Sequence, residues 1–131
     1  MGDLEDLIPR SKHDISGIAA LQGIDPEAAI PILPQLFAWT RDLNWPVARE
    51  LIGVLPRFHK QLLPLVRDVL CGRDEMWKLW TLYLVEQFPE GSLRLLIPRI
   101  KRMAEKPTEQ EIESGASDKS SEILQVLGIN Q

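Results

Sequence analysis

A proline-containing pattern occurs three times along this 131-residue chain and constrains its fold more than any other feature. The three copies share a proline between aliphatic residues: Ile32-Leu33-Pro34-Gln35-Leu36, Leu62-Leu63-Pro64-Leu65-Val66 and Leu96-Ile97-Pro98-Arg99-Ile100. Their prolines lie 30 and then 34 residues apart, which is the period of repeats made of two helices. After each copy comes a turn-type aspartate able to open a second helix: Asp42, Asp74 and Asp118. The sequence therefore predicts an all-α fold, a short HEAT-like helical-repeat array of about three helix pairs in a right-handed solenoid.

Caps and prolines predict where the helices begin and end. The expected helices are Asp14–Leu21, Asp25–Thr40 (kinked or split by Pro31 and Pro34), Trp45–Leu55 (capped by Asn44), Lys60–Gly72, Asp74–Phe88, Ser92–Met103 and Asp118–Leu127. The helix that Asp74 opens is apolar on nearly every face, so we expect it to be the most buried. Residues 106–117 are expected to form a mobile insertion with one short helix, because Thr108 and Glu111 have the spacing of a capping box. No run alternates with period two, so no sheet is expected.

Composition and charge indicate which partners and which cellular compartment suit this protein. The formal net charge is −4, the wrong sign for a protein that holds nucleic acid by neutralising its phosphates. Cys71 is the only cysteine, which indicates a reducing compartment. The start of the chain is acidic and lacks the basic, then apolar, pattern of a signal peptide. Charges also interrupt every apolar stretch before the ~18 residues of a membrane span. We expect a single cytoplasmic domain over residues 1–131, with an acidic leader over residues 1–10.

One motif in the first expected turn carries a family resemblance. The stretch Asp42-Leu43-Asn44-Trp45-Pro46-Val47-Ala48 resembles a small bacterial family of HEAT-like proteins of unknown function, as do Leu33-Pro34-Gln35-Leu36, Asp74-Glu75-Met76-Trp77-Lys78 and the tail from Arg102 through Glu111. The resemblance covers about Ile8 to Leu127. It implies an α-helical HEAT-like array and brings no activity, cofactor or catalytic residue with it. Small proteins of this kind can act as immunity or adaptor components beside toxins.

The same turn is the candidate partner-binding site. Its candidate residues are Arg41, Asp42, Asn44, Trp45, Arg49 and Glu50. A flat aromatic ring flanked by an acid, an amide and a guanidinium suits a peptide or a polar loop of a partner. The alternative interpretation is structural: Asp42 and Asn44 cap helix ends while Trp45 fills the gap between stacked repeats. Trp77 and Trp80, with Lys78 between them, are likewise either a groove wall or core residues.

Signatures of catalysis, cofactor binding and metal binding are missing from the sequence. His13 and His59 have no cysteine or histidine nearby at metal-ligand spacing. Neither a nucleophile elbow nor a glycine-rich phosphate loop occurs. We therefore predict no catalytic residue, no cofactor and no metal. Two acidic runs are either a solvated surface or an attraction for a basic partner: Asp3, Glu5 and Asp6, and Glu105, Glu109, Glu111 and Glu113.

Three hypotheses about function follow. The favoured one is a non-catalytic protein-binding module, in one version a toxin-neutralising or adaptor protein, with a protein partner and neither membrane nor nucleic acid. The alternative is a HEAT-like nucleic-acid-processing enzyme of the DNA glycosylase type. That enzyme would use a groove of Trp39, Asp42, Trp45 and Arg49 and the local basic cluster Arg94, Arg99, Lys101 and Arg102. In the third hypothesis, the exposed end of the array mediates self-association.

Overall fold

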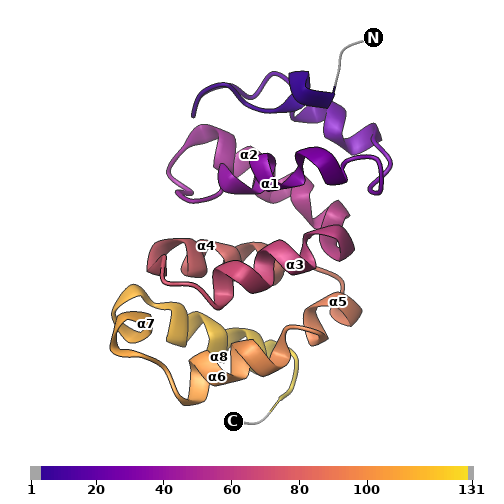
Figure 1. Cartoon of the computed structure of the whole chain (residues 1–131). Helices are drawn as coiled ribbons and strands as arrows, with labels where there is room; N and C mark the ends of the chain where they lie inside the picture. The colour runs from indigo at the N-terminus through magenta and orange to yellow at the C-terminus, as the bar shows by residue number, and fades with distance from the viewer. Residues whose placement is uncertain (1–3, 130–131) are drawn as a thin grey trace. The chain divides into compact units, whose positions relative to one another are not determined.

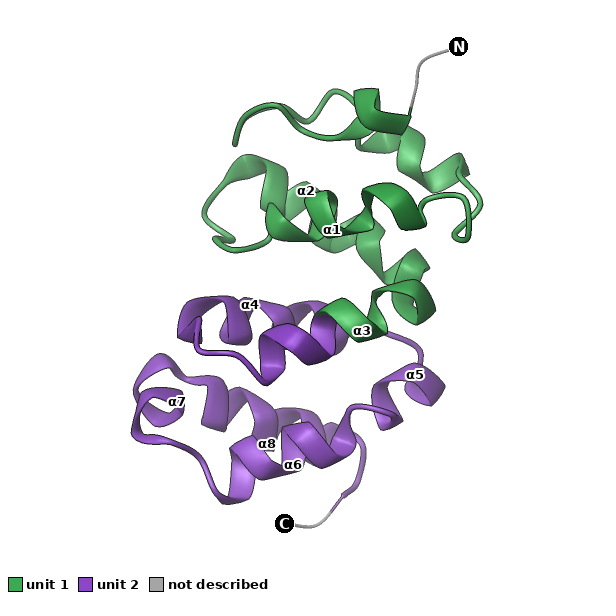
Figure 2. Ribbon diagram, in the orientation of Figure 1, with its two compact units in different colours: residues 1–65 green, residues 66–131 purple. Residues whose placement is uncertain are grey.

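The computed structural model describes residues 4–129, and those residues form helices and turns with no strand among them (Figure 1). The predicted all-α class is confirmed. The chain divides into two compact units, residues 1–65 and residues 66–131 (Figure 2). Within the described part, no helix is both long enough and apolar enough to cross a membrane.

Unit 1 is built from short helices, most of which begin at a proline. Its elements are η1 (Leu4–Leu7), η2 (Ala19–Gly23), η3 (Ile30–Ile32), α1 (Leu33–Ala38), α2 (Pro46–Val54) and η4 (Leu55–Phe58), followed by α3 (His59–Leu70), which runs into unit 2. A proline occupies one of the first two positions of η3, α1, α2 and η4. Proline has no N–H and fits best in the first turn of a helix, where that N–H would have no intrahelical partner. The predicted split of the segment after Asp25 is therefore confirmed, with η3 and α1 as its helical pieces.

The helix predicted over Asp14–Leu21 is wrong. Only the 3₁₀ helix η2 forms near its end, and the Asp14 carboxylate caps a turn instead. It accepts hydrogen bonds from the Ser16 hydroxyl at 2.6 Å and from the Arg10 N–H at 3.0 Å. The backbone at Gly17 also passes so close to Leu7 that a Cβ there would lie 2.9 Å from the Leu7 Cα. This close approach requires glycine.

The core of unit 1 consists of aliphatic and aromatic side chains from nearly every one of its elements. Its fully buried large members are Leu21, Leu33, Leu36, Phe37, Leu51, Leu55, Phe58 and Leu62. Arg57 closes one end of this core, because its guanidinium donates to the carbonyls of Leu21 at 2.8 Å and Ile24 at 3.0 Å. The Leu21 carbonyl, near the end of η2, also accepts from the Ile24 N–H at 3.4 Å, and Ile24 follows the last residue of this helix.

Unit 2 is organised around its last helix. Its elements after α3 are α4 (Glu75–Val85), α5 (Glu90–Arg94), α6 (Ile97–Glu105), α7 (Glu109–Ser114) and α8 (Ala116–Val126). Helix α8 packs along α6 and also contacts α4 and α7 (Figure 1). The buried core comprises Val66, Leu70, Leu82, Leu84, Val85, Phe88, Leu93, Leu96, Ile100, Met103, Ala116, Ile123 and Leu124.

Two of the predicted helix starts in unit 2 are confirmed. The Asp74 side chain caps α4 by accepting from the Trp77 N–H at 3.1 Å. The capping box of Thr108 and Glu111 is present and opens α7. The cap predicted at Asp118 is wrong, because α8 begins two residues earlier, after a glycine with φ of 95°. Asp118 lies instead in the first turn of α8, where an acid favours the helix dipole.

Two predicted helices in unit 2 are shorter or interrupted. The segment Ser92–Met103 is divided between α5 and α6, and Pro98 occupies the first turn of α6. Helix α4 ends at Val85 rather than near Phe88. It is not buried on every face either, since Met76 is 47% exposed.

Candidate functional site

The six predicted partner-binding residues lie together in unit 1, in the turn before α2 and on its first turns. We call residues 41–50 the corner. The Asp42 carboxylate accepts a hydrogen bond from the Asn44 N–H at 2.8 Å, and the Asp42 carbonyl accepts from the Trp45 N–H at 3.1 Å. An aspartate that binds the N–H two residues ahead forms an Asx turn. Asp42 therefore shapes the turn rather than capping a helix directly.

The cap predicted at Asn44 is wrong. Helix α2 begins at Pro46, and Trp45 is the capping residue, with extended backbone and no side-chain capping bond. The reason is the proline: a residue that precedes proline is driven to extended backbone, and Pro46 itself has no N–H to satisfy. The side chain of Asn44 is left exposed.

Two further hydrogen bonds hold the corner in place. The Arg49 Nε donates to the Leu43 carbonyl at 3.1 Å, so one turn of α2 is tied back to the preceding loop. The Val47 N–H donates to the Lys12 carbonyl at 3.0 Å, which joins the start of α2 to the N-terminal segment. The backbone of the corner is thus fixed from both sides.

An aromatic pair lies at the corner. The Trp39 and Trp45 rings meet edge to face, with centroids 5.7 Å apart and planes at 69°, a favoured geometry for aromatic rings. Both rings are half-buried, whereas Arg41, Asn44 and Glu50 are exposed. Asp42 and Arg49 therefore hold the turn in shape. The edge of the tryptophan pair lies at the surface, next to the exposed polar side chains of the corner.

Unit 2 contains a buried charge cluster that was not predicted from the sequence. Its centre is Glu111 of α7, whose side chain is fully buried. Arg102 of α6 donates to both carboxylate oxygens of Glu111, at 2.6 and 2.7 Å. Lys78 of α4, 5% exposed, donates to Glu111 and to Glu75 at 3.1 Å each. We call these four residues the Glu111 cluster; they join three helices through charge-assisted hydrogen bonds.

Glu111 stays ionised although it is buried. Burial alone raises the pKa of this carboxyl, but the hydrogen bonds from Arg102, from the Thr108 N–H and from Lys78 outweigh it and lower the pKa to about 2. The hydrogen bonds to Glu111 in turn raise the pKa of Arg102. Glu111 is thus a buried ion-pair partner, and its assignment to a solvated acidic run is wrong.

Part of the signal for this cluster was present in the sequence. A glutamate at the third position of a capping box folds back over the helix start, and a lysine inside an apolar helix needs a partner when it is buried. Nothing in the sequence indicates that these two residues, 33 positions apart, pair with each other. A second lysine follows the same rule: Lys119 is 7% exposed, pairs with Glu86 at 2.6 Å and lies 4.2 Å from the centre of the Tyr83 ring.

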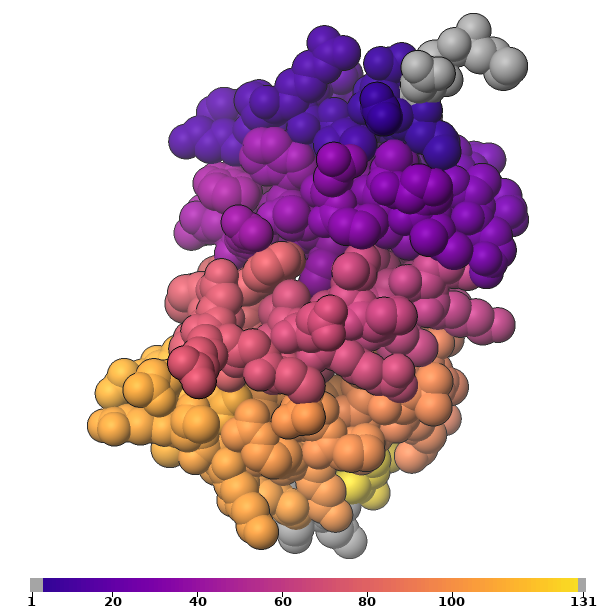
Figure 3. All heavy atoms as spheres, in the orientation of Figure 1, coloured from indigo at the N-terminus to yellow at the C-terminus, as the bar shows by residue number. Residues whose placement is uncertain are grey.

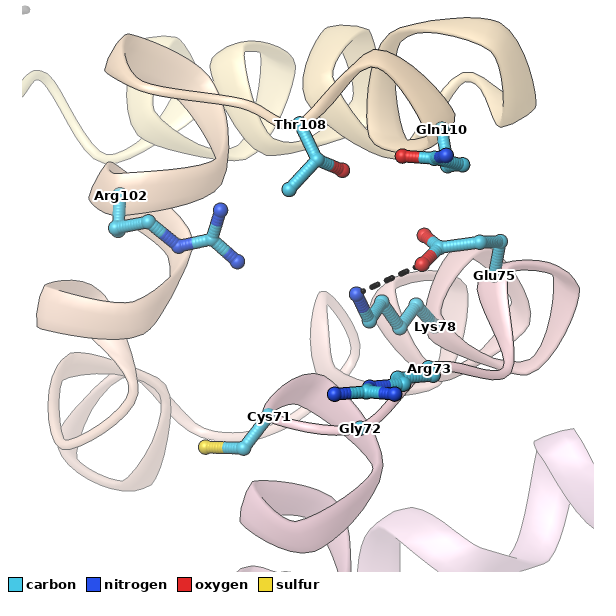
Figure 4. Close-up of a pocket in the computed structure, with 8 residues that line it drawn as sticks. All are labelled: Cys71, Gly72, Arg73, Glu75, Lys78, Arg102, Thr108 and Gln110. Atoms are coloured by element: carbon cyan, nitrogen blue, oxygen red, sulfur yellow. Dashed lines mark hydrogen bonds and ion pairs between the residues drawn. The ribbon is translucent and has the colours of Figure 1, made fainter.

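A pocket of about 620 Å³ opens beside the Glu111 cluster, between the α3–α4 turn and the start of α7 (Figure 4). Its lining residues are Cys71, Gly72, Arg73, Glu75, Lys78, Arg102, Thr108 and Gln110. A second pocket of about 400 Å³ shares Cys71 and Arg102 with the first. The side chains in these pockets are suited to binding through charge and hydrogen bonds.

The remaining predicted candidates belong to neither the corner nor the Glu111 cluster. His13 is exposed and His59 is half-buried; burial and the charge of Lys60 lower the pKa of His59. Trp77 and Trp80 are half-buried on α4. Among residues 4–129, no group of three or more histidine, cysteine, aspartate and glutamate side chains is placed to hold a metal ion.

Comparison with known proteins identifies a family but no function. Residues 7–124 match a family described as a domain of unknown function, DUF5071. This agrees with the expected resemblance to an uncharacterised family. A comparison with curated proteins gives no match.

Proposed function

The chain belongs to the DUF5071 family of unknown function. From the structure of the corner we propose that the chain is a non-catalytic protein-binding module that uses the corner as its contact surface. The proposal is supported by a contrast between the fixed backbone of the corner and its exposed side chains. Its backbone is held by the bonds of Asp42 and Arg49, while Trp45 and its exposed neighbours face the surface. A rigid, partly exposed aromatic anchor loses little conformational freedom on binding.

We also propose that the fold is HEAT-like. The three proline patterns fall on three helical segments: Pro34 in the first turn of α1, Pro64 inside α3 and Pro98 in the first turn of α6. After each comes a turn and a further helix, namely α2, α4 and the pair α7–α8. This recurrence supports a repeat of helix pairs. The right-handed solenoid is part of the same proposal, and an experimental structure of the full chain tests it.

The enzymatic alternative has less support. A glycosylase-type groove in unit 1 would need Asp42 and Arg49 to face a substrate, but both side chains bind the backbone of their own turn. The partner-binding proposal needs only the exposed residues and the tryptophan edge. Toxin neutralisation remains one version of this proposal, with the partner's identity to be found by experiment.

Photo-crosslinking in the organism that the chain comes from tests the proposal. A photoreactive side chain replaces Asn44 in the full chain, and a matched control places it at Gln22, an exposed amide of η2. We expect a discrete crosslinked protein from position 44 that is absent from position 22. An excess of unmodified chain should compete it away, and an Asn44→Lys chain should compete less well than a Gln22→Lys chain.

Two outcomes contradict the proposal. One is the absence of any discrete product at position 44; the other is the same set of products at both positions. Melting curves of the two lysine variants control for unfolding. Because both positions are exposed, we expect each variant to unfold within about 0.5 kcal/mol of the original chain.

A further inference from the structure

We propose that unit 2 carries a second binding surface, formed by arginines around Cys71, for an acidic and partly apolar segment of a partner protein. This inference deepens the proposed function and rests on it only in taking the occupant to be a protein. The corner belongs to unit 1 and this surface to unit 2, so different variants test the two. We call the surface the arginine surface; its residues are Arg67, Cys71, Arg73, Leu95, Pro98, Arg99 and Arg102.

The arginine surface consists of the two pockets beside the Glu111 cluster. Cys71 and Arg102 line both pockets, so the pockets adjoin. Figure 3 shows the pink atoms of the α3–α4 region beside the orange atoms of α6 on one face of unit 2. In Figure 4 the Arg102 guanidinium points into the first pocket, opposite the turn that holds Arg73. A pair of adjoining pockets about 620 and 400 Å³ in volume suits an extended segment.

The charges of this surface are only partly neutralised within the protein. Glu111 and Glu75 neutralise Lys78 and Arg102. In the described part of the chain, no hydrogen bond or ion pair to the guanidinium groups is found for three other arginines: Arg67, Arg73 and Arg99. The arginine surface is therefore locally cationic on a chain whose formal net charge is −4. Acidic segments are drawn to such a region and away from the rest of the chain.

Several acidic side chains lie on the same elements, and some already have partners. Asp74 is engaged as the cap of α4, and Glu105 pairs with Lys101 at 4.0 Å. Asp68 is exposed on α3, and Glu109 is exposed at the start of α7. Glu75 lines the first pocket, but it pairs with Lys78, which lines the same pocket. Neither Asp68 nor Glu109 lines either pocket, so the arginines supply the excess charge of the lining.

Arg102 gives this surface a fixed element. Its side chain is 33% exposed, and both terminal nitrogens are held by the buried carboxylate of Glu111. Glu111 already neutralises this guanidinium, so Arg102 forms a fixed wall of the surface and leaves the binding of carboxylates to the other arginines. Arg67, Arg73 and Arg99 then supply forked donors that match carboxylate geometry.

Apolar residues beside these arginines favour a protein segment over a nucleic acid. Leu95 is 56% exposed and lines the second pocket together with Pro98 and Arg99. An acidic peptide with aliphatic side chains covers that apolar surface while its carboxylates reach the arginines. A phosphate backbone carries charge but no apolar group that could cover Leu95 and Pro98.

The chain contains its own reporter for this surface. Cys71 is the only cysteine, it is exposed, and it lines both pockets. The rate at which the neutral reagent iodoacetamide alkylates Cys71 therefore measures access to the arginine surface. The probe is a synthetic peptide of alternating glutamate and leucine; its control replaces each glutamate with glutamine.

We expect the acidic peptide to slow alkylation of the full chain in a saturable manner, and the glutamine peptide to leave the rate unchanged. Raising the salt from about 0.05 M to about 0.5 M should weaken the protection. The double variant Arg73→Ala/Arg99→Ala should bind the acidic peptide about tenfold more weakly, the effect of losing ~1.4 kcal/mol of charge-assisted contacts. The matched control is Arg94→Ala, because Arg94 lies outside both pockets and pairs with Glu90.

Three outcomes overturn the proposal. They are no protection by the acidic peptide, equal protection by the glutamine peptide, and stronger protection by a DNA oligonucleotide than by the acidic peptide. Helical circular dichroism of the double variant shows that it remains folded. A crosslinked partner at position 44 together with an unprotected Cys71 would contradict the arginine surface alone, and the reverse pair of results would contradict the corner alone.

Discussion

The corner and the Glu111 cluster are built from similar residues and use them in opposite ways. Each combines carboxylates with arginine. In the corner, the Asp42 carboxylate and the Arg49 guanidinium bind nearby backbone at the surface. In unit 2, a buried carboxylate is paired with cations from two other helices. The difference teaches that burial, rather than residue type, sets how strongly such groups affect stability.

The expected contributions of these groups to the free energy of unfolding follow from solvent screening. Exposed ion pairs contribute about 0–1 kcal/mol. Removing one partner of a buried pair costs about 3–5 kcal/mol, because the remaining charge stays buried without compensation. Substitutions of the exposed side chains of the corner should therefore change the free energy of unfolding little, whereas loss of the Glu111 charge should destabilise unit 2.

The largest expected effect comes from Glu111→Gln. The substitution preserves shape but removes the charge that compensates Lys78 and Arg102. Lys78 retains Glu75 as a partner, so we expect a loss near the lower end of the buried-pair range, about 3 kcal/mol of unfolding free energy. Chemical denaturation of the full chain, followed by helical circular dichroism, measures it.

The matched control is Glu113→Gln, which changes an exposed glutamate of the same helix. Its expected effect is within about 0.5 kcal/mol. Equal losses in the two variants would show that the Glu111 cluster contributes no more than a surface charge, and the contrast between the two regions would fail.

A related prediction concerns pH. The pKa of Glu111 is lowered from an ordinary 4.5 to about 2, so the folded state binds the proton more weakly than the unfolded state. The resulting stability is fully present above the unfolded pKa and is lost as the pH falls through 4.5 towards 2. That shift corresponds to about 3 kcal/mol. Between pH 7 and pH 3, the original chain should therefore lose more stability than Glu111→Gln; parallel curves would contradict this.

How far the sequence predicts this structure depends on whether the signal is local. The caps at Asp74 and Thr108 and the helix breaks at Pro31 and Pro34 depend on neighbouring residues, and they are predicted correctly. A local signal is not sufficient, because the caps predicted at Asn44 and Asp118 are wrong. The failed helix at Asp14 depends on the distant contact between Gly17 and Leu7. The Glu111 cluster depends on packing between α4, α6 and α7, which no local pattern encodes. The corner residues were found together because they are consecutive in sequence, and their binding role remains a prediction.

Trp45→Ala should have an intermediate effect. It removes the edge-to-face contact with Trp39, but the ring is only half-buried. We expect a loss of about 1–2 kcal/mol, below the 3–5 of a fully buried aromatic. Trp45→Phe keeps an aromatic edge and should lose less than half as much. A loss from Trp45→Ala as large as that from Glu111→Gln would show that Trp45 is chiefly a core residue and would weaken its role as a partner anchor.

The smallest expected effects on stability distinguish Asp74 from Asp42, two turn aspartates that are similar in the sequence. Asp74 caps α4 by accepting from the Trp77 N–H, so Asp74→Ala should cost about 1 kcal/mol. Asp42 binds the Asn44 N–H in a turn outside any helix, and that donor is near enough to the surface for water to replace the carboxylate. We expect about 0.5 kcal/mol or less for Asp42→Ala. Denaturation of both variants under the same conditions measures the difference. A larger loss of unfolding free energy from Asp42→Ala than from Asp74→Ala would contradict this expectation. It would show that the Asx turn stabilises more of the protein than its own loop. The rigidity of the corner would then depend on Asp42 rather than on the hydrogen bonds of Arg49 and Val47.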